Sequence, residues 1–245
     1  MNLQYLFVCG CPRSGTTSMT YRLAEHPEIM LGVERFKRMT NSAARLDELQ
    51  PALFEEERFF DFRDSDTNNT PEKRESFANH YALMRERYAG GRMRVIGDKH
   101  PGYFRHYDAL DSRFPDARFV FMLRHPAAVA RSYEARLARP NDRWQWSGED
   151  AVNDWNESIQ RTRDFMARAP GRLFVCQFER FYAGDVDYYR ELLAFVGVTP
   201  DSAAEQAYLR STKRWDARSE GYPTTLPAGT DVETLGALGV SYGAT

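Results

Sequence analysis

The chain has 245 residues, of which 33 are lysine or arginine and 35 are aspartate or glutamate, so its formal net charge is −2. With 42% hydrophobic and 13% aromatic residues it can bury a sizeable core, which excludes a disordered protein. The near-neutral balance argues against general nucleic-acid binding, although cations can still gather in one cleft. The longest early apolar run, residues 5–9, is too short for a membrane span or a signal peptide, so we expect a cytoplasmic protein without a membrane partner.

Short apolar runs alternate with longer segments of helical periodicity along the chain. The predicted strands are residues 5–9, 94–96, 118–123 and 173–176. Each is apolar nearly throughout, as parallel strands are when helices cover both faces of their sheet. This alternation predicts an α/β fold, a three-layer sandwich with a central parallel sheet flanked by helices.

The predicted helices are residues 17–25, 103–114, 127–138, 148–167 and 186–196. The first three end close to Pro27, Pro115 and Pro140, because the residue before a proline is disfavoured in the helical conformation. Two segments lack clear periodicity. We expect short helices and a mobile cover in residues 36–79, and irregular structure in residues 211–245. No linker composition interrupts the sequence, so the whole chain is predicted to be a single domain.

The three cysteines are Cys9, Cys11 and Cys176, an odd number without a CxxC pair. No histidine and cysteine cluster has the spacing of zinc ligands. We therefore expect buried thiols, no disulfide framework and no metal.

The first predicted strand runs into a loop bounded by glycines and then into the first helix. Gly10 and Gly15 allow a tight turn, and the amides at the start of the helix can point at an anion. The spacing fits the nucleotide-binding pattern GxxxxGK[ST] with Thr17 in the last position, but Thr16 stands where the lysine belongs. Arg13 instead supplies a cation inside the loop, and no predicted strand ends in the aspartate that would hold magnesium. The loop is predicted to bind a phosphate-like group without a divalent metal.

The string CPRSGTT at residues 11–17 resembles the first signature of the sulfotransferases that use 3′-phosphoadenosine-5′-phosphosulfate (PAPS). In this family the loop holds the 5′-phosphosulfate of the donor, and the fold is a P-loop-like three-layer sandwich. The resemblance implies that the cofactor is bound by Arg13, Ser14, Gly15, Thr16 and Thr17. It also implies that Arg13 stabilises the charge that develops on the leaving phosphate.

A second resemblance lies at the end of the third predicted strand. That strand is followed by Arg124, and Ser132 comes eight residues later in the next helix. An arginine at the carboxyl end of a parallel strand lies at the edge where open α/β sheets bind ligands. The stretch resembles the family motif whose Arg and Ser bind the ribose 3′-phosphate. ATP and GTP lack this phosphate, so the resemblance implies PAPS as donor and adenosine 3′,5′-bisphosphate (PAP) as product.

Transfer to a hydroxyl or an amine also needs a base for the acceptor proton. Glu34, after the stop His26-Pro27, resembles the glutamate base of the tyrosylprotein and carbohydrate branches of the family. Lys99 lies in the segment DKHP, which resembles a segment of those branches whose lysine contacts the transferring group. The cytosolic small-molecule branch uses a histidine at this place, which keeps His100 as the alternative base. We expect Glu34 as the base and Lys99 as an electrostatic catalyst.

Aromatic side chains are candidates for the acceptor site, with core packing as the alternative for each. The candidates are Phe59, Tyr103, Trp144 and Trp146, and core packing is the favoured interpretation of Trp155.

The adjacent cations Lys213 and Arg214 resemble, by position, a late basic loop that closes over the 3′-phosphate in the family. Residues 36–79 and 211–245 match nothing else in the family and are expected to face the acceptor.

These observations predict an enzyme that moves the sulfuryl group of PAPS to a hydroxyl or amine of a carbohydrate or small-molecule acceptor, without a metal. A P-loop phosphotransferase is the alternative from another reaction class, disfavoured by Thr16. A module that binds PAP without catalysis is the third. The sequence names neither the acceptor nor the oligomeric state.

Overall fold

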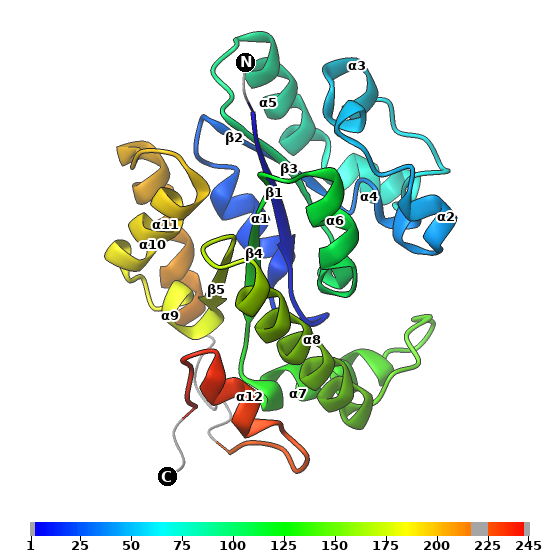
Figure 1. The fold of residues 1–245 in the computed structure, drawn as a ribbon, viewed down its shortest axis with the longest axis vertical. Helices are drawn as coiled ribbons and strands as arrows, with labels where there is room; N and C mark the ends of the chain where they lie inside the picture. The colour runs from blue at the N-terminus through cyan, green and yellow to red at the C-terminus, as the bar shows by residue number, and fades with distance from the viewer. Residues whose placement is uncertain (1–2, 217–224, 243–245) are drawn as a thin grey trace.

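A parallel sheet of five strands forms the centre of the protein (Figure 1). The computed structural model describes residues 3–216 and 225–242, with side chains described up to residue 212 and again from residue 225. The strands are β1 (Gln4–Cys9), β2 (Ile29–Val33), β3 (Val95–Lys99), β4 (Arg118–Leu123) and β5 (Leu173–Gln177). They lie in the order β2-β3-β1-β4-β5 and every neighbouring pair is parallel. The predicted α/β class is confirmed.

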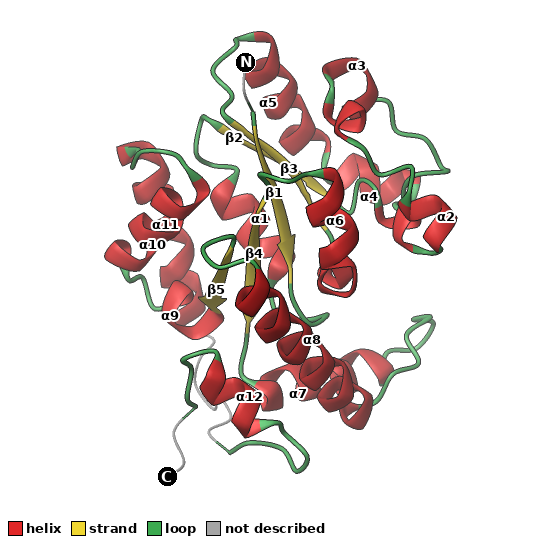
Figure 2. Ribbon diagram, in the orientation of Figure 1, coloured by secondary structure: helices red, strands yellow, loops and turns green. Residues whose placement is uncertain are grey.

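Helices cover both sides of this sheet, as Figure 2 shows. The longer ones are α1 (Thr16–Leu23), α5 (Ala78–Ala89), α6 (Tyr107–Arg113), α7 (Pro126–Leu137), α8 (Gly148–Arg168), α10 (Val186–Val196) and α11 (Ser202–Asp216). The shorter ones are α2 (Ala43–Leu46), α3 (Glu56–Phe59), α4 (Pro71–Ser76), α9 (Phe178–Tyr182) and α12 (Val232–Ala237). The 3₁₀ turns are η1 (Lys37–Thr40), η2 (Pro51–Phe54) and η3 (Pro101–His106).

The side chains of β1 divide the core into two layers. Leu6 and Val8 pack with residues of α1, α10 and α11, whereas Phe7 and Cys9 pack with residues of α5, α6 and α8. Successive residues of a strand point to opposite faces, so a strand that is apolar throughout requires cover on both. This requirement produces the three-layer sandwich.

The sequence prediction missed β2. Its residues, IMLGV, are all buried, but the run is short and contains Gly32, which weakens a strand signal. Packing explains the glycine at position 32, because a Cβ there would lie 2.7 Å from the carboxylate of Asp98 on the neighbouring β3. The strand matters for the site because Glu34 follows it directly.

The two segments without clear periodicity differ. Residues 36–79 contain the short helices that were predicted. The prediction of irregular structure from residue 211 onward is wrong in two places, because α11 continues to Asp216 and α12 forms at Val232–Ala237. Asp231 caps α12 by accepting the amide of Thr234 at 3.0 Å. A tertiary contact explains α12, since it packs against α8.

Candidate active site

The loops at the carboxyl ends of β1, β2, β3 and β4 enclose a cleft of about 640 Å³. The cleft gathers predicted residues from four separate segments: Arg13, Gly15, Thr16, Thr17, Glu34, His100, Arg124, Ser132 and Trp144. Parallel strands end at one edge of the sheet, and this is where open α/β sheets bind ligands. The two signatures and both candidate bases therefore face one space.

The phosphate loop between β1 and α1 depends on glycine at two positions. Gly10 has a φ of +151° and approaches β4 so closely that a Cβ would lie 2.5 Å from the carbonyl oxygen of Met122. Gly15 has a φ of +89°, and a Cβ there would meet the ring of Phe178 at 2.5 Å. Ser14, between them, is fully buried, and its hydroxyl has no hydrogen-bond partner among the described residues. A buried polar group of this kind is suited to a ligand or an ordered water.

Arg13 joins the two signatures. Its Nε donates to the hydroxyl oxygen of Ser132 at 3.1 Å, and Nη1 of Arg124 donates to its carbonyl oxygen at 3.0 Å. Burial lowers the pKa of Arg13, and the guanidinium groups of Arg136 and Arg124 act in the same direction. The sequence analysis described the loop and the second motif as separate sites. In the structure, Arg13 connects them through its hydrogen bonds to Ser132 and Arg124.

Arg136 is a cation of the cleft that the sequence analysis did not identify. It is held by two hydrogen bonds to the carboxylate of Asp142, at 2.8 and 3.2 Å, and lies 4.4 Å from the centre of the Trp144 ring. The available signal was its position four residues after Ser132, which places both on one face of α7.

Glu34 is surrounded by three ammonium groups. Its Oε1 pairs with Nζ of Lys99 at 2.9 Å, and its Oε2 pairs with Nζ of Lys37 at 3.1 Å and of Lys73 at 3.8 Å. Burial alone would raise the pKa of Glu34, but the three lysines together hold it well below its ordinary value. The carboxylate is therefore ionised at neutral pH.

Lys99 lies behind Glu34 and does not line the cleft. Its side chain is 0% exposed, and burial lowers its pKa, against the opposing effect of the Glu34 carboxylate. Among the described residues, the lysine that lines the cleft beside Glu34 is Lys37. It was not identified from the sequence, although its place three residues after Glu34 favours an ion pair.

His100 also lines the cleft, next to Glu34. Burial and the nearby charge of Lys37 lower its pKa to about 3, so the imidazole is neutral at pH 7. Its Nδ1 is buried with no hydrogen-bond partner among the described residues. The structure thus places both candidate bases at the cleft.

Asp98, at the end of β3, fixes the chain that follows Glu34. Its carboxylate accepts the backbone amides of Arg35 at 3.0 Å and of Phe36 at 3.2 Å. The hydroxyl of Tyr103 donates to the same carboxylate at 2.7 Å. Tyr103 is fully buried, so its observed contact is with this structural carboxylate and not with the cleft.

The other proposed acceptor residues are divided between core and surface. Phe59 is fully buried, whereas Trp144 lines the cleft and Trp146 is 50% exposed beside it. The two tryptophan rings lie 4.8 Å apart, and Nε1 of Trp144 donates to the carbonyl oxygen of Trp146 at 2.8 Å. Trp155 is buried, as the core interpretation predicted, and its Nε1 donates to the carbonyl oxygen of Arg124 at 2.9 Å.

Lys213 and Arg214 fall in the last turn of α11 and lie outside the residues whose side chains the structure describes. Within residues 3–216 and 225–242, no group of three or more histidine, cysteine, aspartate or glutamate side chains could hold a metal ion. In the same part of the chain, no helix is long and apolar enough to cross a membrane.

Arg105 also lines the cleft and was not identified from the sequence. Its Nε donates to Glu157 and its Nη2 to Asp154, each at 2.8 Å, and both carboxylates come from α8. Its charge is therefore largely neutralised by α8.

A phosphate loop, a group of arginines and an ionised carboxylate share this one cleft, an arrangement that suits a phosphate-containing ligand. A model of the sulfotransferase family matches residues 5–202, and the chain belongs to that family. The resemblance observed in the sequence is thereby confirmed.

The chain is also similar to curated proteins. It is 31% identical over 143 residues to the nodulation protein NoeE of Sinorhizobium fredii (strain NBRC 101917 / NGR234). The aligned region covers 55% of this chain and 32% of that protein. It is 24% identical over 197 residues to a protein-tyrosine sulfotransferase of Drosophila melanogaster, covering 79% of this chain and 38% of that protein. The chain thus spans about a third of the length of these relatives.

Solved structures share the fold at lower identity. The sulfotransferase domain from the curacin biosynthetic pathway superposes with a TM-score of 0.59 at 16% identity, covering 98% of both chains. The sulfotransferase domain from the Synechococcus PCC 7002 olefin synthase gives 0.57 at 21% identity, covering 97% of this chain and 94% of the other. These similarities establish the P-loop-like sandwich.

Proposed function

We propose that the protein transfers the sulfuryl group of PAPS to a hydroxyl or amine of an acceptor and releases PAP. The observation that carries this proposal is the hydrogen bond between Arg13 and Ser132 in a cleft that Glu34 also faces. It joins the loop for the 5′-phosphosulfate to the motif for the 3′-phosphate, with a carboxylate beside them.

The residues of the cleft suit an anionic nucleotide donor. Arg13, Arg124 and Arg136 supply positive charge, and α1 begins in the same loop, where the amides of its first turn favour an anion. The unpartnered hydroxyl of Ser14 supplies a further donor within that loop. When bound, PAPS supplies an activated sulfuryl group, whose transfer leaves PAP.

Glu34 is the residue that we assign as the base. Its ionised carboxylate accepts the proton of the acceptor hydroxyl while the acceptor oxygen bonds to sulfur and the sulfur–oxygen bond to the phosphate breaks. The electron pair of that bond leaves on the phosphate oxygen, where the guanidinium of Arg13 stabilises the charge. Atoms and charge balance without a metal or a redox partner.

Lys37 tunes this base. An acceptor that displaces the Lys37 ammonium from Oε2 raises the pKa of Glu34 at the stage when the proton must be accepted. His100 is the alternative base, favoured by its neutral ring and its unpartnered Nδ1.

The acceptor is proposed to be a carbohydrate or another small hydroxyl compound that contacts Trp144 and Trp146 at the cleft mouth. A half-exposed tryptophan that touches a second one offers an apolar face for a ring. The name of the Drosophila relative adds a tyrosine-containing peptide to the compounds worth testing.

The first experiment is a calorimetric titration with PAP, 5′-AMP and ATP in the presence of EDTA. We expect PAP to bind at least about tenfold more tightly than 5′-AMP, a difference of about 1.4 kcal/mol. Equal binding of the two would contradict the 3′-phosphate assignment.

The second experiment measures PAP release from PAPS with water, simple sugars, phenols and a tyrosine peptide as acceptors. Release above the protein-free rate supports the proposal, and its absence with every acceptor overturns it. Magnesium-dependent turnover of ATP would instead favour a phosphotransferase.

A further inference from the structure

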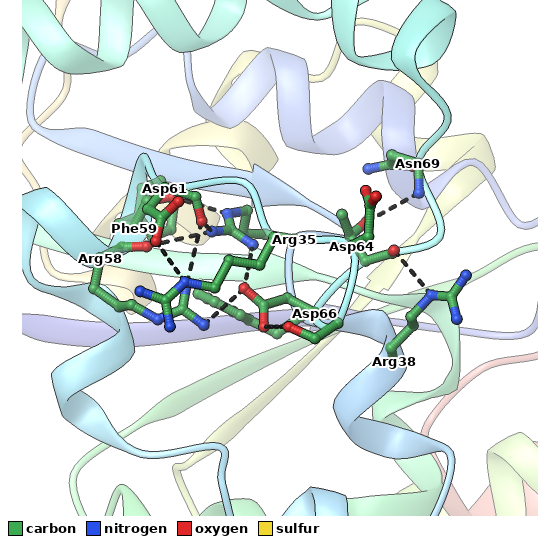
Figure 3. A network of polar contacts seen from close by, with 12 residues as sticks. Arg35, Arg38, Arg58, Phe59, Asp61, Asp64, Asp66 and Asn69 are labelled. Carbon is green, nitrogen blue, oxygen red and sulfur yellow. Dashed lines mark hydrogen bonds and ion pairs between the residues drawn. The ribbon is translucent and has the colours of Figure 1, made fainter.

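A buried polar network connects the cover segment to the residue that follows Glu34 (Figure 3). Arg35 is fully buried, and its Nη1 pairs with Oδ2 of Asp66 at 3.1 Å. Its Nε donates to the carbonyl oxygen of Phe59 at 2.8 Å. Arg58 pairs with the same Asp66 oxygen at 2.7 Å, so the loop from residue 58 to residue 66 is folded around the Arg35 guanidinium.

Two side chains just beyond this loop hold the backbone of the base. The hydroxyl of Thr67 donates to the carbonyl oxygen of Glu34 at 2.7 Å and accepts the amide of Asn69 at 3.1 Å. Nδ2 of Asn69 donates to the carbonyl oxygen of Val33 at 2.9 Å. Thr67 and Asn69 are only 1% and 2% exposed, so no water replaces these donors without rearrangement.

The backbone of Glu34 needs such support. Its φ is +52°, a left-handed conformation that costs a residue with a Cβ about 1–2 kcal/mol. A conformation of this kind persists only where the surroundings impose it. Its amide donates to the carbonyl oxygen of Lys99 at 2.7 Å, and Thr67 holds its carbonyl on the other side.

We propose that Thr67 and Asn69 are positioning residues, which the Arg35–Asp66 ion pair holds in place and which aim the Glu34 carboxylate into the cleft. The inference rests on the proposed function, in which Glu34 accepts the acceptor proton. Glu34 and Arg35 are adjacent in the chain, but their side chains have different surroundings. One faces the cleft, and the other binds the loop that positions it.

The test compares Thr67→Val with Thr67→Ser, since valine removes the hydroxyl at nearly constant volume and serine keeps it. PAP release from PAPS is measured with water and with the most active acceptor of the panel. We expect the valine variant to lose about 10- to 100-fold in kcat, as misplacement of a catalytic group does, with the affinity for PAP unchanged. The serine variant should restore the rate. Thr162→Val, which removes a buried hydroxyl bonded to the hydroxyl of Tyr107 in the core, is the matched control.

A double variant separates positioning from general stability. If Thr67 acts through Glu34, Glu34→Gln combined with Thr67→Val should be no slower than Glu34→Gln alone. A further independent loss in the double variant would contradict the proposal. If the valine variant does not fold, Asn69→Ala carries the same comparison.

The failures of the two proposals are distinguishable. A wild-type protein without turnover, or a fully active Glu34→Gln, removes the proposed function or its base. A wild-type protein that depends on Glu34 while Thr67→Val and Asn69→Ala keep the full rate removes only the positioning role.

Discussion

The two sides of the cleft are built in different ways. On the proposed donor side, the phosphate loop follows β1 without interruption, and its shape comes from glycine backbones and the start of α1. On the side of the proposed base, Glu34 depends on side chains from distant segments, among them Thr67, Asp98 and Lys99. The phosphate loop is a local motif that tertiary contacts join to Arg124 and Ser132, whereas the position of Glu34 is itself a product of tertiary contacts. Substitutions should therefore act differently on the two sides.

The largest effect is expected from Glu34→Gln, which removes the base and leaves the donor side intact. General-base catalysis contributes about 10²–10⁴-fold, so kcat should fall by that factor while PAP binds as before. The measurement is PAP release beside a titration with PAP. The variant Glu48→Gln, at a half-exposed glutamate paired with Arg45, is the matched control. A Glu34→Gln protein that keeps its rate, together with an inactive His100→Gln, would move the base to His100.

Arg124→Ala should break the donor side alone. Hydrogen bonds to charged groups contribute about 1.5–3 kcal/mol, so the affinity for PAP should fall roughly 10- to 100-fold, with a smaller change for 5′-AMP. Calorimetry with both ligands measures this difference. An equal loss of affinity for PAP and 5′-AMP would mean that Arg124 supports the loop through Arg13 and does not bind the 3′-phosphate. Arg210→Ala, at an exposed position of α11, should change neither affinity.

Gly15→Ala tests how strongly the donor side depends on its backbone. The left-handed φ costs about 1–2 kcal/mol of unfolding free energy for a residue with a Cβ, and the ring of Phe178 must also move. We expect a lower midpoint in denaturant unfolding and weaker binding of PAP. Gly171 has a similar positive φ, and a Cβ there would have no neighbour within 4 Å. Gly171→Ala should therefore lose only the part of the unfolding free energy that comes from the backbone conformation.

Lys37→Met should change the pH dependence without removing the base. The lysines hold the pKa of Glu34 below its ordinary value. The wild-type carboxylate therefore stays ionised at pH values below the pKa of an ordinary glutamate. Without Lys37 the pKa rises, and the acid limb of kcat moves to higher pH. In the Lys37→Met variant, the contribution of the ionised Glu34 carboxylate to the free energy of unfolding is likewise lost at a higher pH, as the pH is lowered, than in the wild type.

A pH–rate profile of wild type, Lys37→Met and Lys73→Met measures this effect. Lys73 lies farther from Oε2, at 3.8 Å, and its removal should shift the limb less. An acid limb that does not move in either variant would show that another group controls it.

The sequence predicted four of the five strands and the glycine-bounded loop after β1 because both depend on contiguous residues. The prediction missed β2, whose short run carries Gly32 for a contact with Asp98 that no local pattern encodes. It also assigned Tyr103 and Phe59 to the acceptor, whereas both lie in the core. An aromatic residue near a strand end has the same local appearance in either role, and only packing separates them.

The sequence by itself determined the phosphate loop, the arginine and serine of the second motif, and the alternation that makes a parallel sheet. These features depend on short-range backbone geometry and on strand periodicity, which adjacent residues specify. Only the tertiary structure decided that Arg13 bonds to Ser132, that Lys37 and not Lys99 lines the cleft beside Glu34, and that Thr67 and Asp98 hold the backbone of Glu34 and of the residues that follow it. The contacts of Arg13, Thr67 and Asp98 join residues far apart in the chain, and they form only when the folded sheet brings its strand ends to one edge.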